Sequence, residues 1–368
     1  MDGLATLEKE WGELESKIDS CGFYHTVEWY KSYVDEIDQD LLFFALYLDE
    51  NLSAIFPLKS TIRQMFGLRL KVLQLPEHPH FPLKDFIFPL TGKTNIIAEF
   101  ISNLNNGTEM KWDLIEVRGV FLGASLVTEV ERGALEKVVV ERSRRKTNYF
   151  ECNDFSDIRA GFSKNFKGNL RKARNKLHKA GEVDFETVRS VPELYDAFEV
   201  FLEIEGSGWK GEEGVGTAIK LDPSLVKFYR SLINNFGGEK KDGRRYVEIN
   251  LLRLNEEVIA AQFCIVVRET VYILKIGYRE DYSFCSPGNM LVEYRLRLAC
   301  EDENIRYVNL VTDMSWHKSW NPSALEKCSV LIWNNTWLGA VSYCAYKIRE
   351  RLAVNKSGIG RRKGSPQN

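Results

Sequence analysis

The spacing of apolar and polar positions divides the chain into short strands and amphipathic helices. In the N-terminal half, runs rich in β-branched and aromatic residues predict strands over 41–48, 52–58, 68–75, 112–117 and 135–140. Apolar residues at helical spacing in the same half predict helices over 4–18, 23–33 and 94–104. The two kinds of element alternate, which favours an α/β or α+β domain with a mixed sheet.

The C-terminal half follows a similar pattern. Helical spacing predicts helices over 163–180, 191–205, 223–235, 288–303 and 337–352. Period-two runs predict strands over 246–254, 258–268, 270–278 and 306–311. A chain of 368 residues is long for one core, so we expect two domains, 1–158 and 159–352. The polar stretch 353–368 is predicted to be a disordered basic tail.

The stretch 270–302 has the strongest local signal for a ligand site. A strand is followed by a polar loop and then by Ser286, Pro287, Gly288 and Asn289, which are typical of a helix start. Free N–H groups at such a start can bind phosphate oxygens. The alternative is an ordinary connection between a strand and a helix.

A basic helix is predicted immediately after the domain boundary. Phe166, Leu170, Ala173, Leu177 and Ala180 form one apolar stripe, while eight basic residues and no acidic one lie between 159 and 181. The charges indicate either an anionic partner or a solvated face.

Two further motifs are weaker. The segment GSGWKGEEGVG, from 206 to 216, contains G-x-G-x-x-G but follows a helix and not a strand, so a dinucleotide fingerprint is rejected. We interpret it as a mobile loop with Trp209 and Lys210 as contact residues. His78 and His80 have no further ligand at a useful spacing, so a solvated loop is preferred to a metal site.

Polar residues also follow the predicted strand 306–311. Asp313 lies there with Trp316, His317, Lys318 and Trp320. Ligands often bind beyond the carboxyl ends of strands, so this block is a candidate binding site, although a structural role is an equal alternative.

Composition excludes several classes of protein. The net charge is -2, which gives no overall attraction to nucleic acid, and the longest apolar run, 258–267, is too short to span a bilayer. The N-terminal twenty residues are polar and acidic, unlike a signal peptide. Seven scattered cysteines are typical of free thiols. We therefore expect a cytoplasmic protein, with peripheral attachment at the inner membrane as a further possibility.

Three blocks in the second half resemble the FemAB/CelD-type acyltransferases of the GNAT superfamily. NLRKARNKLHKAG is similar to that family's basic helix. FLEIEGSGWKGEEGVG is similar to its Glu-x-x-x-Trp-Lys-Gly segment, here Glu205, Trp209, Lys210 and Gly211. LKIGYREDYSFCSPGNML is similar to its Lys-x-Gly-Tyr strand with a following Ser-Pro-Gly, here Lys275, Gly277, Tyr278, Ser286, Pro287 and Gly288. HTVEWYKSY and FALYLDENLSAIFPLKS in the first half are weaker matches.

The resemblance implies two GNAT-like units in tandem, the second holding the better-defined site. It implies transfer of an acyl group, with acetyl as the expected group, from acyl-CoA to an amine, in cell-envelope or exopolysaccharide synthesis. Aminoacyl-tRNA is the alternative donor. It further implies that strand 270–278 splays from the next strand to admit the donor. Ser286-Pro-Gly288 departs from the Arg/Gln-x-x-Gly-x-Gly/Ala loop of GNAT enzymes, and the block from Asp313 to Trp320 departs from the family's Lys-x-x-Trp ending.

The resemblance and the chemistry of acyl transfer together assign expected roles. Glu205 or Asp313 takes the proton of the amine, and Tyr278 returns one to the leaving thiolate. Lys275 lies among apolar neighbours and is expected to be partly buried with a partner. Trp209, Lys210, Trp316 and Lys318 are expected to bind substrate, and Ser286, Gly288 and Asn289 the donor's phosphates; no metal is expected. Two other classes remain open: a nucleic-acid-binding module, or a silent scaffold of the same fold. The basic helix 163–180 could meet tRNA or an anionic membrane surface.

Overall fold

The computed structural model describes residues 2–90, 94–133, 135–208, 210–211, 214–238 and 245–360. The strands are β1 (Leu42–Leu48), β2 (Asn51–Met65), β3 (Leu68–Gln74), β4 (Leu114–Phe121), β5 (Val138–Glu151), β6 (Val183–Val188), β7 (Arg245–Leu254), β8 (Glu257–Val267), β9 (Thr270–Tyr278), β10 (Tyr307–Asn309) and β11 (Ser323–Trp333). The α-helices are α1 (Asp2–Ser16), α2 (Val27–Glu36), α3 (Ile96–Gly107), α4 (Ser125–Glu131), α5 (Phe155–Ala160), α6 (Lys164–Ala180), α7 (Val191–Gly206), α8 (Pro223–Phe236), α9 (Pro287–Glu301) and α10 (Trp337–Gly360). Four 3₁₀ turns are η1 (Phe23–His25), η2 (Ile219–Leu221), η3 (Glu280–Cys285) and η4 (Ser315–Trp320).

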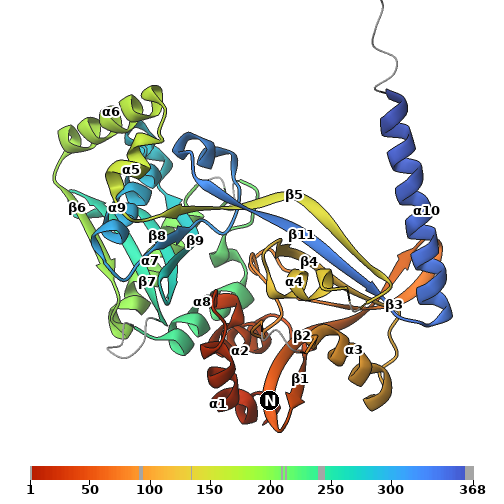
Figure 1. Ribbon diagram of the computed structural model, residues 1–368. Coiled ribbons are helices and arrows are strands. Elements are labelled where there is room, and N and C mark those ends of the chain that lie inside the picture. The colour runs from red at the N-terminus through yellow and green to blue at the C-terminus, as the bar shows by residue number, and fades with distance from the viewer. Residues whose placement is uncertain are drawn as a thin grey trace, which may run out of the picture.

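These strands form one mixed sheet that runs the length of the molecule (Figure 1). Its order is β1-β2-β3-β4-β11-β5-β10-β9-β8-β7-β6. Most neighbouring pairs are antiparallel, whereas β3 with β4 and β9 with β10 are parallel. Helices flank both ends of the sheet, so the predicted α/β class with a mixed sheet is confirmed, although the two units share one continuous sheet.

Strand pairing crosses the predicted boundary between the units in two places. β11, from the C-terminal part of the chain, lies between β4 and β5 of the first unit. β5 in turn pairs with β10 of the second unit. Long β5 and β11 therefore connect the two halves, as Figure 1 shows. The boundary at 158 also falls inside α5, so the units are not two independent stretches of chain.

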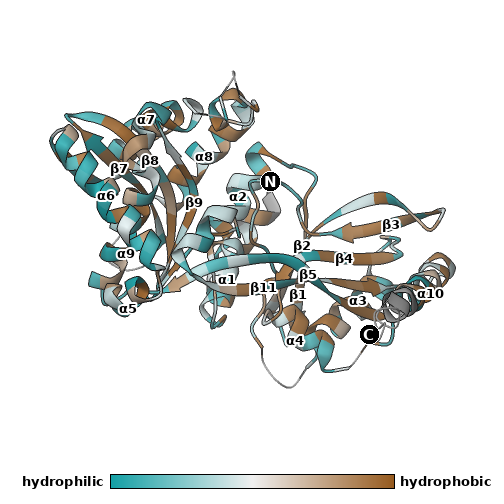
Figure 2. Cartoon of the chain, turned by 90° about the horizontal axis from the view of Figure 1, so that it is seen from above, coloured by the Kyte–Doolittle hydropathy of each residue, from teal (hydrophilic) through white to brown (hydrophobic). Residues whose placement is uncertain are grey.

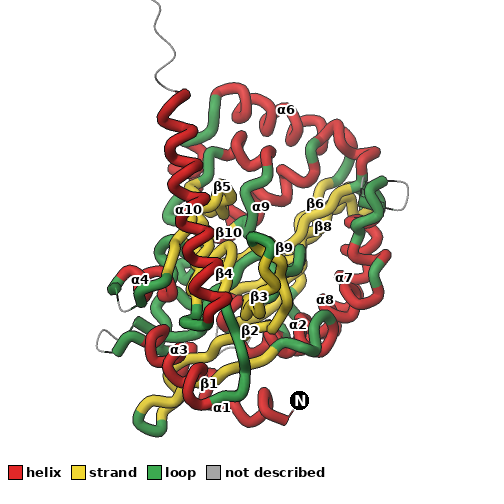
Figure 3. Tube along the Cα trace, turned by 90° about the vertical axis from the view of Figure 1, so that its right-hand side faces the viewer, coloured by secondary structure: helices red, strands yellow, loops and turns green. Residues whose placement is uncertain are grey.

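The second unit has a core on each face of its strands. On one face, α7 and α8 pack with α1 and α2 against β7, β8 and β9. On the other face, α6 and α9 cover the same strands, and Figure 3 shows the two pairs of helices on opposite sides. Strand β8 is buried on both faces, which explains its nearly unbroken apolar sequence.

The predicted stripe of α6 is confirmed. Phe166, Leu170, Ala173 and Leu177 are all buried, and the Ser163 hydroxyl caps the helix by accepting the N–H of Phe166. The outer side of α6 is mostly hydrophilic in Figure 2.

The first unit has its main core between its strands and α3 and α4. A smaller cluster on the opposite face includes Tyr346 of α10, which stands at the edge of the molecule beside β3 (Figure 1). α10 continues to Gly360, into the stretch 353–368 that is predicted to be disordered, and 361–368 lies outside the described residues. β6, α4 and β11 are not among the elements predicted from the sequence. None of the described helices is long and apolar enough to cross a membrane.

Candidate active site

The edge between β9 and β10 opens soon after the strands meet. They pair only over Thr270–Tyr272 and Tyr307–Asn309, and the rest of β9, 273–278, continues without β10 beside it. The predicted splay is therefore present. The residues expected to carry the chemistry, Lys275 and Tyr278, lie on the unpaired part of the strand.

Helix α7 approaches this part of β9 very closely. A Cβ added to Gly277 would lie 2.7 Å from the Cα of Glu205, so a side chain at 277 would force the helix away from the strand. Lys275 lies on the same face of β9 as Gly277, because their partners Phe263 and Ala261 on β8 both face the α7 core. The glycine thus allows Glu205 to sit next to Lys275.

Glu205, Lys210 and Lys275 form an ionisable group, the Glu205 cluster, in which Glu205 is buried and both lysines are partly buried. Glu205 is 4% exposed and accepts hydrogen bonds from Lys210 Nζ at 2.9 Å and from the N–H of Ile219 at 2.9 Å. Burial, and then the charge of Lys210, lower the pKa of Lys275 to about 8, while Glu205 acts in the opposite direction. A lysine in this setting can exchange a proton near neutral pH.

The loop between β3 and α3 brings two histidines of the first unit to this cluster. A ring nitrogen of His80 lies 3.0 Å from the hydroxyl of Tyr229 on α8. Burial, followed by the charge of Lys275, lowers the pKa of His80 to about 3. The pKa of His78 is also lowered, chiefly by burial. The expectation of a solvated loop is wrong: both side chains are half-buried and face the second unit.

Two buried lysines hold this histidine loop from its ends. Lys84 Nζ donates to the carbonyl of Pro76 at 2.7 Å, and Lys327 Nζ donates to that of Pro82 at 3.2 Å. Burial lowers the pKa of both lysines to about 8. His78, His80 and Tyr229 were not predicted as site residues. The apolar composition of PEHPHFP was a possible signal, because a solvated loop would need fewer such residues.

Tyr278 and the start of α9 lie on the other face of β9. A Cβ on Gly288 would be 3.4 Å from the Tyr278 ring and 3.8 Å from Ile276, both ordinary contacts. Tyr278 is 38% exposed, so its hydroxyl can reach a bound molecule. The predicted donor-binding turn and the predicted proton donor are therefore neighbours.

The helix start differs in detail from the prediction. Ser286 adopts a left-handed conformation with φ of 49°, and its side chain makes no capping hydrogen bond. Its carbonyl instead accepts the N–H groups of Asn289 and Met290. The N–H of Gly288 has no partner among the described residues, so fewer backbone donors face outward than the sequence pattern implied. The side-chain oxygen of Asn289 accepts the indole N–H of Trp320 at 3.3 Å, which gives Asn289 a structural contact.

The block after β10 is tied to a different part of the sheet. Asp313 is exposed and accepts the N–H of Lys146 on β5 at 3.0 Å. Within the described part of the chain it makes no hydrogen bond or ion pair with the Glu205 cluster. Trp316 packs edge-on to buried His317, whose pKa burial lowers to about 4, and Lys318 is exposed. The structure thus brings Glu205, Lys210 and Lys275 together but leaves Asp313, Trp316 and Lys318 outside that group.

The predicted mobile loop is only partly described, and Trp209 lies outside the described residues. The carbonyl of Lys210 accepts the N–H groups of Thr217 and Ala218, and Gly211 donates to the carbonyl of Gly208. These bonds fold the loop back on itself beside Glu205, with Lys210 at its centre.

Comparison with known proteins follows this geometry. Residues 164–319 match the family model of the acetyltransferase (GNAT) domain, a segment that runs from α6 into η4 and includes the splayed strand and the Glu205 cluster. No curated protein matches the chain.

Solved structures of low sequence identity share the whole fold. FemX superposes with a TM-score of 0.55 at 10% identity, covering 90% of this chain and 96% of that one. A protein of unknown function from Bacteroides thetaiotaomicron gives 0.53 at 14% identity, covering 89% and 97%. The C-terminal domain of a candidate lysylphosphatidylglycerol synthetase from Agrobacterium fabrum gives 0.50 at 11% identity, covering 94% and 95%.

The likeness covers both units in each case, and the splayed β9–β10 edge lies within the matched segment. Residues 164–319 are thus similar to GNAT acetyltransferase domains, and the solved structures share the fold of both units. Acyl transfer is the activity that this similarity supports.

Proposed function

We propose that the protein transfers an acyl group, with acetyl as the expected group, from acyl-CoA to an amine acceptor. The observation that carries this proposal is the arrangement around β9. The Glu205 cluster lies on one face of the strand, and the Ser286–Asn289 turn with Tyr278 lies on the other. A thioester placed at the splayed edge would have proton acceptors on one side. On the other side it would have the hydrogen-bond donors that bind the phosphates of coenzyme A.

The reaction can be written with these groups. An acceptor that arrives as an ammonium must first lose a proton, and Glu205 or the neutral form of Lys275 receives it, directly or through water. The amine nitrogen then attacks the thioester carbonyl, the new C–N bond forms, and the C–S bond breaks. The Tyr278 hydroxyl supplies a proton to the departing thiolate, and the second proton that leaves the nitrogen as the amide forms returns to the Tyr278 oxygen. Holding donor and amine together supplies much of the rate. His80, which is neutral at physiological pH, can accept or donate a hydrogen bond without adding charge.

The biological setting follows from the sequence resemblance to FemAB/CelD-type proteins. We place the activity in cell-envelope or exopolysaccharide synthesis, with the protein in the cytoplasm or at the inner face of the membrane. The acceptor would be a small or glycan-linked amine.

Donor binding is tested with acetyl-CoA and the Gly288→Val variant. The added methyl groups would crowd the only N–H of the turn without a partner among the described residues, so we expect about a tenfold loss of acetyl-CoA affinity in calorimetry. The melting temperature should change little, because the first carbon fits at ordinary contact distances. Gly12→Val, at an open position on α1, is the matched control. Unchanged affinity in Gly288→Val would exclude this turn as the donor site.

The outer face of α6 favours a second candidate, in which the donor is an aminoacyl-tRNA. Arg171, Lys172, Lys176 and Lys179 are exposed there. Arg174 is not available to a partner in the same way, because it pairs with both oxygens of Glu293 at 2.6 and 2.7 Å. The structural likeness to a candidate lysylphosphatidylglycerol synthetase is consistent with aminoacyl transfer.

Replacing Arg171, Lys172 and Lys176 together with glutamine should separate these donors. If α6 binds tRNA, affinity for unfractionated tRNA should fall, and the slope of log affinity against log salt should decrease by about two to three. The control replaces exposed Lys9, Lys17 and Lys227 in the same way. Equal tRNA binding and equal salt dependence in both triple variants would make α6 a solvated face and leave acyl-CoA as the donor.

A further inference from the structure

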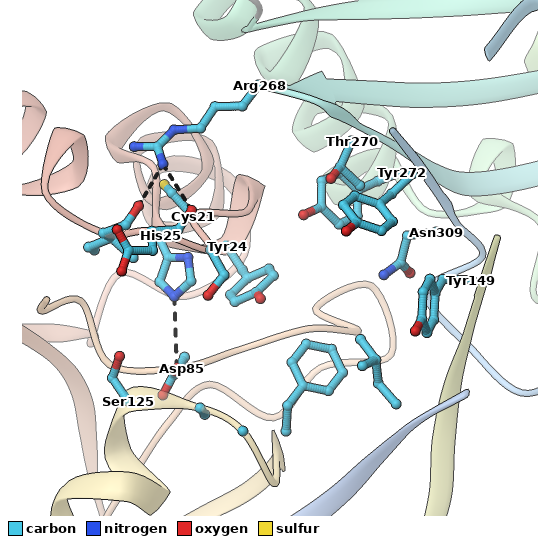
Figure 4. A pocket seen from close by; sticks show the side chains of 18 of the residues that line it. Cys21, Tyr24, His25, Asp85, Ser125, Tyr149, Arg268, Thr270, Tyr272 and Asn309 are labelled. Atoms are coloured by element: carbon cyan, nitrogen blue, oxygen red, sulfur yellow. Dashed lines mark hydrogen bonds and ion pairs between the residues drawn. The ribbon is translucent and has the colours of Figure 1, made fainter. Parts of the chain in front are cut away.

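A cavity of about 870 Å³ lies between the two units, away from the Glu205 cluster. Its walls come from the N-terminal turns, α4, β5, the β8–β9 turn, β10 and β11, and Figure 4 shows it from close by. No member of the Glu205 cluster and neither histidine of the 76–82 loop lines it. A chain of packed rings separates the two places: Tyr272 in the cavity wall contacts Phe23, which contacts Trp29, which contacts Phe81 of the histidine loop.

Aromatic rings form a large part of the wall. The rings of Tyr149 and Tyr307 pack edge to face with their centroids 6.1 Å apart. The rings of Tyr24 and Phe121 pack in the same way with centroids 6.3 Å apart. Together with Tyr272 they bring five rings from both units to one space. Ring faces attract organic cations. Arg306 already lies 5.6 Å from the centroid of Tyr307 and Lys327 lies 5.7 Å from that of Phe121, so the rings offered to a ligand's ammonium are those of Tyr24, Tyr149 and Tyr272.

The charged groups of the wall are mostly acidic. Asp19, Asp85, Glu151, Glu269 and Glu326 line the cavity, against a single arginine. That arginine, Arg268, is already engaged, because its guanidinium donates to the carbonyls of Glu15 and Ile18. It therefore balances little of the acidic charge. Glu269 and Glu326 have other cationic partners, Arg306 at 3.4 Å and Lys146 at 3.5 Å, which leaves Asp19, Asp85 and Glu151 as the carboxylates of interest.

Two of the carboxylates are poorly compensated within the described residues. Asp85 is 6% exposed; one of its oxygens accepts its neighbour's N–H, and the other has only His25 Nε2 at 3.9 Å. The side chain of Glu151 makes no hydrogen bond or ion pair with a described residue, and it is exposed at the rim of the cavity. A buried carboxylate normally has close partners, so Asp85 is short of a donor or a cation.

Two buried polar groups also point into the cavity without a partner in the described chain. The Tyr24 side chain is 6% exposed, and its hydroxyl makes no hydrogen bond. Asn309 is equally buried; its oxygen accepts the N–H of Val311 at 2.8 Å, which leaves its NH₂ group unpaired. Figure 4 shows Tyr24 on the Asp85 side and Asn309 beside Tyr272 and Tyr149. Both atoms are open to the cavity, where a bound molecule or water can satisfy them.

We infer that this cavity binds an organic ammonium compound, with the charged nitrogen at Asp85, the tyrosine rings around its carbon skeleton, and a hydrogen-bond acceptor of the ligand at Asn309. The inference goes beyond the acyl-transfer proposal and does not depend on it, since it concerns a different cavity. The volume admits a ligand considerably larger than a simple amine.

The test uses 1,8-diaminooctane and the uncharged 1,8-octanediol in calorimetric titrations at pH 7 and low salt. The diamine should bind at least about tenfold more tightly than the diol, because only the ammonium pairs with a buried carboxylate. Asp85→Asn should weaken diamine binding about tenfold, and Glu151→Gln, which is more exposed, about threefold. Glu303→Gln removes an exposed carboxylate outside the cavity and should have no effect.

The result is decisive in either direction. Equal affinity for diamine and diol would overturn the inference, because the charge would then contribute nothing. Unchanged affinity for the diamine in both Asp85→Asn and Glu151→Gln would also overturn the inference, provided that each variant shows a cooperative thermal unfolding transition. Glu151→Gln keeps the test valid if Asp85→Asn fails to fold. Loss of acetyl-CoA binding elsewhere in the protein would bear only on the proposed transferase function.

Discussion

Replacing Glu205 with glutamine is expected to lower kcat for acyl transfer by about two to four orders of magnitude. An amide cannot accept a proton at neutral pH. The substitution also leaves Lys210 and Lys275 without the carboxylate that lies between them. The amide oxygen can still accept the N–H of Ile219, so the loop after α7 should keep its attachment. We therefore expect a folded protein with little activity.

The pH profile distinguishes a chemical role of Glu205 from a positioning role. Glu205 raises the pKa of Lys275 against the opposing influences of burial and Lys210. Without the carboxylate, the pKa of Lys275 should fall below about 8, and the limb of the rate profile that reports its titration should move to lower pH. The control is Glu203→Gln on the exposed side of the same helix, where the carboxylate pairs loosely with Lys220 at 3.5 Å. Full turnover of a well-folded Glu205→Gln protein would mean that Lys275 or the substrate's own groups take the proton.

Local patterns predicted most individual elements of this fold because their causes are local. The stripe of α6, the β7–β8 hairpin and the Pro287 start of α9 depend on periodicity, turns and caps within a few residues. The pairing of β5 and β11 across the two units could not be predicted from such local patterns. Pairing of β4 with β11 joins residues about 200 positions apart. The apolar pattern of a strand predicts the strand itself but does not identify the strand with which it pairs. A division of the chain at one point was therefore too simple.

The sequence indicated which side chains of the second unit lie together, but not the contacts that form where the two units meet. The catalytic roles of these residues stay predictions. Glu205, Lys210 and Lys275 lie in motifs of the second unit, and the close contact at Gly277 explains why they converge. The sequence favours a solvated loop for His78 and His80 because it shows no further ligand at a useful spacing and gives no sign of the second-unit residues that cover them. Their burial is created by docking against α8, through Tyr229. Asp313 was selected for following a strand, but β5, brought in by the strand exchange, occupies that position and binds it through Lys146.

Replacing Lys275 with methionine is expected to abolish most acyl transfer while stabilising the protein at neutral pH. Methionine has a similar length and no charge to bury. Glu205 keeps Lys210 and the N–H of Ile219 as partners, so the variant leaves no unpaired carboxylate. The gain in the free energy of unfolding should be at most about 3.5 kcal/mol, because the pKa of Lys275 lies about 2.5 units below 10.5 and each unit corresponds to about 1.4 kcal/mol.

The gain should depend on pH in a defined direction. The folded-state pKa of Lys275 is about 8, below the 10.5 of an exposed lysine. Below pH 8 both states hold the proton, and the folded protein carries the full cost of a buried ammonium. Between about pH 8 and 10.5 the unfolded chain binds more protons, so the stability of the unsubstituted protein rises with pH through this window. The advantage of Lys275→Met should therefore be largest below pH 8 and shrink towards pH 10.5.

Urea unfolding at pH 7, 8, 9 and 10 measures this difference directly. Lys84 and Lys327 titrate in the same range, so only the difference between variant and unsubstituted protein isolates Lys275. Lys227→Met, at an exposed position on α8, should change neither stability nor its pH dependence. A Lys275→Met protein less stable than the parent at pH 7 would show that the ammonium is well compensated, and its assignment as a proton acceptor would fail. A more stable Lys275→Met protein would instead show that Lys275 destabilises the fold at the position where the proposed reaction removes a proton from the acceptor amine. Active sites commonly lose stability in this way in return for activity.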